Sequence, residues 1–506
     1  METKHKFLSN VRLSYVAKFV SLLALPLVFV LTRTLGAERW GLFSLVISIL
    51  TFLRIIGGSG LGPSTAKHLA GLHGEEGEAK VGPFLAAGLL AQVLIVLVVA
   101  AAFWLTAPTI AGFFAEKTLG SALKMGPFLK IGAIILIFFA LCEFAKAALQ
   151  GAQRFDYVGW VTGVEYAGKL AGAAGLVLLG FGLAGALYGF AFGLIAACCT
   201  ALILFLKLGM RLPSLSGSEW RSLVGYSLPL ILTTASFVIY TELDNIMVGY
   251  YVGIEAVGVY SAALFLARGV PEVAKPIGQA AGPIIVKLNQ LDGDKAAIFA
   301  ERLIKYVLAL FLPISAAIFV LAPNILALAG KDYVAGAPSL RVMSVFILSL
   351  SLGVVVTPML DYLGLAWRRA VWMSVSVSAN VVLNFLLIPR IGAVGAAIAT
   401  AVTHAPYVAN NTWVLCRLVG VKASRVLSAV VKIAAAAAAA AAAAYLTLLW
   451  AGGLILPLSI GVATYAVVLR ATGLFSRPEL IEALSDILIP AKAAPVDDVG
   501  VLEVKG

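Results

Sequence analysis

The number and length of the apolar segments constrain this chain more than any other feature of its sequence. A helix needs about 20 mainly apolar residues to cross a bilayer, and windows of that length fit about fourteen times into the 506 residues. Hydrophobic residues make up 61% of the chain and charged residues 12%, whereas about a quarter of a soluble domain is charged. Because lipid excludes open sheet edges and irregular backbone, we expect an all-α integral membrane protein.

The distribution of Lys and Arg gives an orientation, because cytosolic loops are enriched in these residues. With the N-terminus placed in the cytosol, the cytosolic loops hold about three times as many Lys and Arg as the outer loops. We therefore expect a multi-pass protein of the plasma (inner) membrane with cytosolic N- and C-termini. The net charge of +12 is then explained by loop bias, and no nucleic-acid partner is expected.

A short phrase occurs twice in the chain, as LGAERWGLFS from Leu35 to Ser44 and as VGIEAVGVYS from Val252 to Ser261. At one offset of 217 residues the copies share four pairs: Gly36 with Gly253, Glu38 with Glu255, Gly41 with Gly258, and Ser44 with Ser261. Six spans separate the copies, and an even number preserves orientation, so the halves are parallel repeats. We expect the glycines to permit tight reversals between consecutive helices.

The repeat divides the chain into two parallel six-helix lobes, with two extra C-terminal helices. A polar stretch with Pro, Ser and Gly, LGMRLPSLSGSEW, separates the lobes and is typical of a connection outside the membrane. The expected regions are an N-lobe at 1–207, a cytosolic linker at 208–220, a C-lobe at 221–420, spans thirteen and fourteen at 421–475, and a cytosolic tail at 476–506.

Two segments carry a resemblance to a known family: LDNIMVGYYVGIEAVGVYSAALFLA from Leu243 to Ala267, and LGAERWGLFSL from Leu35 to Leu45. Together with the 6 + 6 + 2 pattern of spans, they resemble the polysaccharide-biosynthesis flippases, which transport O-antigen and lipid-linked oligosaccharides. These belong to the multidrug/oligosaccharidyl-lipid/polysaccharide exporter superfamily. The resemblance implies a V-shaped pair of lobes around a central cavity, which alternate between inward-open and outward-open forms. It also implies polyprenyl-linked oligosaccharide as the substrate.

Ionisable residues inside spans are costly unless they are paired or hydrated, which makes them functional candidates. A polyprenyl diphosphate is anionic, and arginine can hold two phosphate oxygens at once. The candidates for binding this headgroup are Arg54, Arg268, Lys18 and Lys275. Lys18 and Lys275 lie near the cytosolic ends of their spans, so snorkelling to lipid headgroups explains them equally well. Glu272 shares a helical face with Arg268 and Lys275 and can neutralise them.

Acidic residues in the seventh span suggest ion coupling. Glu242 and Asp244 lie in its outer third, where desolvation favours binding of H⁺ or Na⁺. Residues two apart on a helix face different directions, so we expect one of them at most to line a given site. Two other acid–base pairs have the spacing of structural pairs within one helix: Glu165 with Lys169, and Glu143 with Lys146.

The chain lacks the motifs of common enzymes. It has no GxxxxGK[ST] loop and no HExxH sequence, so we expect no catalytic residues, no cofactor, no bound metal and no use of ATP. Besides membrane lipids and the substrate, glycan-assembly enzymes are candidate partners, and we expect a monomer. Three alternatives stay open: a peptidoglycan-precursor flippase, an ion-coupled multidrug exporter of the same superfamily, and a membrane scaffold for glycan enzymes.

Overall fold

The computed structural model describes residues 24–72, 74–115, 125–209 and 217–474. Within these ranges the regular secondary structure is entirely helical. In the first half the elements are α2 Ala24–Ile56, α3 Leu61–Ala70, α4 Gly74–Ala115, α5 Met125–Gly151, α6 Phe155–Lys169, η1 Leu170–Ala174, η2 Val177–Phe181 and α7 Gly182–Lys207. In the second half they are α8 Gly217–Tyr251, α9 Ile254–Gly269, η3 Val270–Ala274, α10 Lys275–Leu291, α11 Gly293–Ala327, η4 Lys331–Gly336, α12 Ala337–Leu360, η5 Asp361–Leu365, α13 Ala366–Ile391, α14 Ala393–Leu418, α15 Ala423–Ala451 and α16 Ile455–Ala471.

The described residues contain eight helical segments long and apolar enough to cross a membrane. Two of these segments, Phe155–Lys207 and Lys331–Ile391, have 53 and 61 residues, far more than one crossing requires. Each contains a sharp turn at a glycine with positive φ, Gly180 at 92° and Gly364 at 83°. The all-helical membrane fold is confirmed, and the number of fourteen spans stays a prediction.

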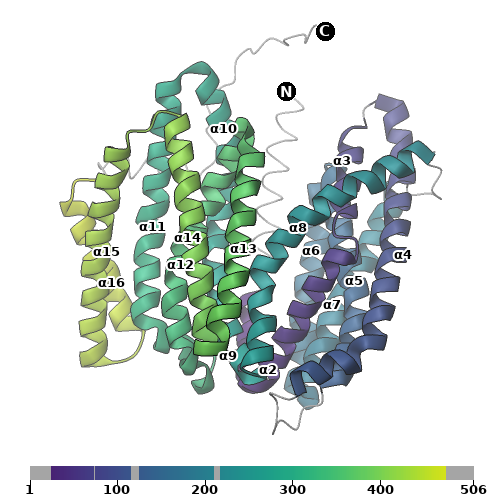
Figure 1. The fold of residues 1–506 in the computed structure, drawn as a ribbon, viewed down its shortest axis with the longest axis horizontal. Coiled ribbons are helices and arrows are strands. Elements are labelled where there is room, and N and C mark those ends of the chain that lie inside the picture. Colours follow the sequence, from purple (N-terminus) through teal and green to yellow (C-terminus); the bar gives the residue numbers. More distant parts are fainter. Residues whose placement is uncertain (1–23, 73, 116–124, 210–216, 475–506) are drawn as a thin grey trace.

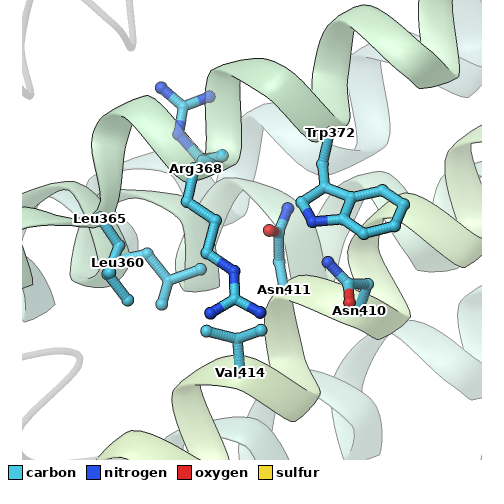
Figure 2. Close-up of a pocket in the computed structure, with 8 residues that line it drawn as sticks. Leu360, Leu365, Arg368, Trp372, Asn410, Asn411 and Val414 are labelled. Atoms are coloured by element: carbon cyan, nitrogen blue, oxygen red, sulfur yellow. The ribbon is translucent and has the colours of Figure 1, made fainter.

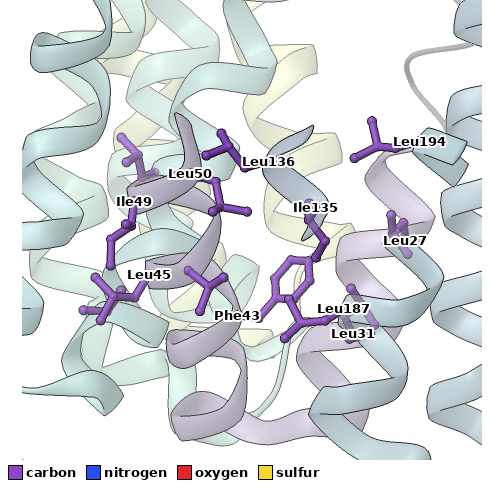
Figure 3. Close-up of a cluster of buried hydrophobic side chains, with 14 of the residues drawn as sticks. Leu27, Leu31, Phe43, Leu45, Ile49, Leu50, Ile135, Leu136, Leu187 and Leu194 are labelled. Atoms are coloured by element: carbon purple, nitrogen blue, oxygen red, sulfur yellow. The ribbon is translucent and has the colours of Figure 1, made fainter. Parts of the chain in front are cut away.

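The helices form two bundles (Figure 1). Helices α2 to α7 pack together on one side and α9 to α14 on the other, while α15 and α16 pack on each other and cover α11. A large apolar core runs through the first bundle and on into α9 and α12. Figure 3 shows part of it, with Leu45 and Leu50 on α2, Ile135 on α5 and Leu187 on α7. In a bilayer such packing stabilises helix association mainly through van der Waals contact.

Helix α8 belongs to both bundles. Its first half lies against α3, where the Ser64 hydroxyl donates a hydrogen bond to the Leu223 carbonyl oxygen at 2.6 Å. Its second half lies against α13 and α14, where Asn384 and Thr400 contact Asp244. In Figure 1 the helix runs obliquely from one bundle to the other. The predicted C-lobe, which begins at residue 221, therefore starts with a helix that the two bundles share.

The glycines of the repeated phrase have two different structural roles. Gly36 and Gly253 have φ values of 74° and 128°, and each allows the sharp change of direction that was expected. Gly41 and Gly258 instead allow two helices to touch. A Cβ atom on Gly41 would lie 2.0 Å from the Ile254 carbonyl oxygen, and one on Gly258 would lie 1.9 Å from that of Ala37. Helices α2 and α9 therefore meet backbone to backbone where the two bundles touch.

Candidate functional site

Arg268 lies at the end of α9 and is held by a residue of α8. Its Nη1 donates to Glu242 Oε1 at 3.0 Å. The other carboxylate oxygen of Glu242 accepts a hydrogen bond from Ser48 Oγ on α2 at 2.7 Å. Ser48 accepts in turn from Asn245 Nδ2 at 3.0 Å. Arg268 is thus connected to the first bundle through Glu242 and Ser48, a polar bridge between the lobes.

Arg54 lies in the last turn of α2. Its guanidinium carbon is 5.1 Å from the centre of the Phe139 ring. Its Nε atom is buried and has no hydrogen-bond partner among the described residues, and none of those residues forms an ion pair with it. A guanidinium has five N–H donors, so Arg54 keeps donors free for an anion.

Two lysines and two carboxylates gather beside Arg54 in the first bundle. Glu165, almost fully buried, accepts from Lys169 Nζ at 2.5 Å and from Lys146 Nζ at 3.1 Å. Lys146 also pairs with Glu143, and Glu143 lies within electrostatic range of Arg54. The two predicted pairs within single helices are present. The additional contact between Lys146 and Glu165 joins the two pairs. Together with Arg54 they make five charges, of which three are positive and two negative, so one positive charge is in excess.

The structure describes one of the two lysine candidates for headgroup binding. Lys275, at the start of α10, forms an ion pair with Glu272 one turn earlier, and both side chains are half-exposed. Glu272 therefore neutralises Lys275, while Arg268 takes its carboxylate from α8 instead. Lys18 lies outside the described residues.

Asp244 is 1% exposed and is surrounded by neutral donors. Its Oδ2 accepts from Thr400 Oγ1 at 2.7 Å and from the Tyr260 hydroxyl at 2.9 Å. Its Oδ1 accepts from Asn384 Nδ2 at 2.6 Å. Among the described residues no Lys, Arg or His forms an ion pair with it. Glu242 and Asp244 thus contact separate sets of partners, as their spacing of two residues predicts.

Sequence reasoning missed the neutral partners of Asp244. Asn380 and Asn384 lie four residues apart on one face of α13, and Asn384 Nδ2 also donates to Asn380 Oδ1 at 3.0 Å. Asn384 Oδ1 is buried with no hydrogen-bond partner among the described residues. Two amides at this spacing within a span were the available signal, because polar residues within a span mark sites in the bundle interior.

The oxygen atoms around Asp244 suit a small cation. A carboxylate, amide oxygens and a hydroxyl are ligands that hard cations prefer, and a buried carboxylate also takes up a proton readily. Within the part of the chain that the structure describes, no three His, Cys, Asp or Glu side chains form a metal cluster.

The described helices thus form two bundles that α8 joins, with Arg268 linked to the first bundle through Glu242 and with Asp244 buried against α13 and α14. A family model described as polysaccharide biosynthesis protein matches residues 7–289. The chain belongs to this family.

Curated and solved relatives agree with this fold. An uncharacterized membrane protein of Methanocaldococcus jannaschii, MJ1375, is 23% identical over 401 residues, which cover 74% of this chain and 89% of the relative. The structure of the lipid II flippase MurJ in an inward closed conformation superposes with a TM-score of 0.72 at 14% identity, and the match covers 91% of this chain and 98% of that one. An inward-facing multidrug resistance MATE transporter of the MOP superfamily superposes with a TM-score of 0.64 at 14% identity, covering 81% and 94%.

Proposed function

We propose that this protein is a flippase that moves polyprenyl-(di)phosphate-linked oligosaccharide from the cytosolic to the outer leaflet by alternating access. The observation that carries the proposal is the pair of arginines, one from each bundle. Arg54 is half-buried, supplies the one excess positive charge of its cluster and keeps donors unpartnered within the described residues. Arg268 is held by a single carboxylate on a neighbouring helix. A diphosphate is the kind of ligand that such a pair of guanidiniums binds.

An apolar cavity gives room for the lipid part of the substrate. It has a volume of about 340 Å³ and lies between α2, α9 and α11. Phe29, Phe265 and Leu328 contribute to its wall. A hydrocarbon chain in this cavity would keep its contact with apolar surface while the headgroup is in the polar interior.

Alternating access needs contacts between the lobes that can break and form again. The bridge from Ser48 through Glu242 to Arg268 suits this role, because a substrate phosphate competes with the Glu242 carboxylate for the guanidinium. Substrate binding at Arg268 would then release Glu242 and loosen its contact with Ser48. Substrate binding thereby favours the alternative conformation, in which this bridge is broken and the two lobes have moved relative to each other.

Asp244 is the proposed site of ion coupling. Arg268 lies within electrostatic range of Asp244, so a change of charge at Asp244 alters how strongly Arg268 attracts an anion. Binding of H⁺ or Na⁺ by Asp244, Asn384 and Thr400 would strengthen phosphate binding at Arg268, and by linkage the reverse also holds. Glu242, the other candidate in this span, acts in this scheme as the counter-ion of Arg268.

The proposal is tested with purified protein in liposomes. Labelled polyprenyl diphosphate sugars are placed in one leaflet, and their appearance in the other is followed over time. The variants Arg54→Ala and Arg268→Ala should each slow transfer about tenfold or more, as loss of a charge-assisted contact predicts. Arg390→Ala is the matched control, because this exposed arginine caps its own helix through the Leu386 carbonyl oxygen. Wild-type transfer in the Arg54→Ala/Arg268→Ala double variant would reject the cationic site.

The same assay separates the competing functions. A lipid-linked peptidoglycan precursor, offered beside the oligosaccharide lipid, tests the precursor-flippase alternative, which the MurJ-like fold favours. Cationic drugs test the multidrug alternative, which the unpaired Arg54 disfavours because it repels cations. Transfer by the purified protein alone would exclude a pure scaffold role. In this proposal the protein acts as a monomer in the plasma membrane, with cytosolic termini and beside glycan-assembly enzymes.

A further inference from the structure

A second polar cluster lies at one end of the second bundle, away from the proposed transport site. It is formed by Arg368 and Trp372 near the start of α13 and by Asn410 and Asn411 near the end of α14. Figure 2 shows both asparagines extending from α14 toward Trp372. Asn411 is eleven residues along α14 from Thr400, about 16 Å at 1.5 Å per residue. The cluster is therefore separate from the Asp244 network.

The two asparagines present hydrogen-bond donors that have no acceptor. The Nδ2 atoms of Asn410 and Asn411 are both buried without a partner among the described residues. Asn411 as a whole is 3% exposed. Buried polar atoms are nearly always paired in folded proteins, so two adjacent unpaired amide groups that line one pocket indicate that a ligand supplies the missing acceptor.

The charges around the pocket indicate that this acceptor is an anion. Arg369 donates through Nε to Asp361 Oδ1 at 2.6 Å, so this arginine is neutralised. Arg368 is exposed and has no ion-pair partner within the ranges that the structure describes. One uncompensated guanidinium and two amide groups thus face a single pocket. The guanidinium and the two unpaired Nδ2 atoms are donors, and the oxygen atoms of a phosphate group accept from such donors.

Exposed tryptophans place the pocket at the level of lipid headgroups. Trp367 is 81% exposed, Trp372 43% and Trp413 51%, and tryptophan is enriched where a span meets the membrane surface. Arg417, at the end of the same α14, lies 4.8 Å from the Trp413 ring centre. From the donors, the charge and this position, we propose that Arg368, Asn410 and Asn411 bind a phosphate group of the kind that anionic lipid headgroups carry.

The test measures binding and needs no transport. Purified protein in a neutral detergent is mixed with phosphatidylglycerol or with phosphatidic acid, and the lipid retained is counted by native mass spectrometry. The variant Arg368→Gln keeps most of the exposed stem and should bind these lipids about tenfold more weakly than the unchanged protein, since a charge-assisted contact is lost. The matched control is Arg417→Gln, which removes an arginine from the same end of the bundle.

The variant Asn411→Leu tests the buried donor separately, with thermal unfolding recorded to verify that the protein is folded. A folded Asn411→Leu protein with reduced lipid retention supports the site. Equal losses in Arg368→Gln and Arg417→Gln, or no loss in Arg368→Gln, would overturn it, because either result means general attraction to a basic surface. Inorganic phosphate is added in a parallel series. Competition at millimolar concentration identifies free phosphate as a ligand of the same site, and no competition identifies the lipid.

Discussion

Ser261 Oγ donates a hydrogen bond to Ser44 Oγ at 3.0 Å, and the two residues are 217 positions apart. This separation is the offset at which the sequence repeats, so each serine contacts its own counterpart in the other lobe. Gly41 and Gly258, the pair one turn earlier, also meet across the lobes. The axis that relates the two repeats therefore passes between these residues. The contact is self-complementary, as in a dimer with twofold symmetry.

A disulfide across this contact should lock the lobes together. The double variant Ser44→Cys/Ser261→Cys, in a background with the exposed Cys199 replaced by serine, should cross-link on mild oxidation because its side chains already touch. Transfer in liposomes should stop, and a reductant should restore it. Each single variant serves as the control. Undiminished transfer by fully cross-linked protein would mean that α2 and α9 do not separate during transport.

Neutralising Glu242 should release Arg268. In Glu242→Gln the guanidinium loses its counter-ion, so we expect severalfold tighter binding of a polyprenyl diphosphate, as removal of a competing carboxylate predicts. Transfer should slow because the link to Ser48 weakens. Equilibrium binding and liposome transfer measure the two effects separately. In Arg268→Ala/Glu242→Gln the gain in affinity should vanish, and a gain that persists would show that Glu242 acts without Arg268.

Removing the charge of Asp244 should uncouple transport from ions. The variant Asp244→Asn preserves the size of the side chain but neither titrates nor attracts a cation. Transfer should then become independent of imposed Na⁺ and pH gradients, at a rate at least tenfold below that of the driven wild-type protein. The control is Asp332→Asn, since Asp332 is an exposed acid in η4. Intact gradient dependence in Asp244→Asn would place the coupling site elsewhere.

The start of α11 should loosen in acid. Asp292 Oδ1 accepts from the backbone N–H groups of Asp294 and Lys295 at 3.0 and 3.3 Å, and these hydrogen bonds lower the pKa of Asp292. A lowered pKa means that the cap stabilises the helix above the unfolded value of about 3.9. This stabilisation is lost as the pH falls through the lower folded-state pKa. Hydrogen exchange of the first-turn amides should accelerate there, whereas Asp292→Asn, which caps without titrating, should show a flatter profile.

Sequence reasoning succeeded where a property depends on local pattern. Segment hydropathy predicted the helical membrane fold, and spacing within one helix predicted the pairs of Glu165 with Lys169 and of Glu143 with Lys146. It could not find the partner of Arg268, because Glu242 comes from another helix and the pairing depends on how α8 and α9 pack. The amides that contact Asp244 were missed for the same reason. A hydropathy profile registers a polar residue in a span only as a loss of apolar character. In the structure Asn384 donates a hydrogen bond to the carboxylate of Asp244.

The shared helix α8 also has a mechanical consequence. Ser222, next to the residue that contacts α3, and Asp244, at the proposed ion site, are 22 residues apart on this helix, about 33 Å at 1.5 Å per residue. Moved as one body, a segment of that length acts as a lever, although Pro229 lies within it. A tilt of about 5° around Asp244 moves the far end by about 3 Å on this rise, enough to break hydrogen bonds at the mouth of the first bundle. In the proposed coupling, a change of charge at Asp244 would thus alter a contact about 33 Å away along α8.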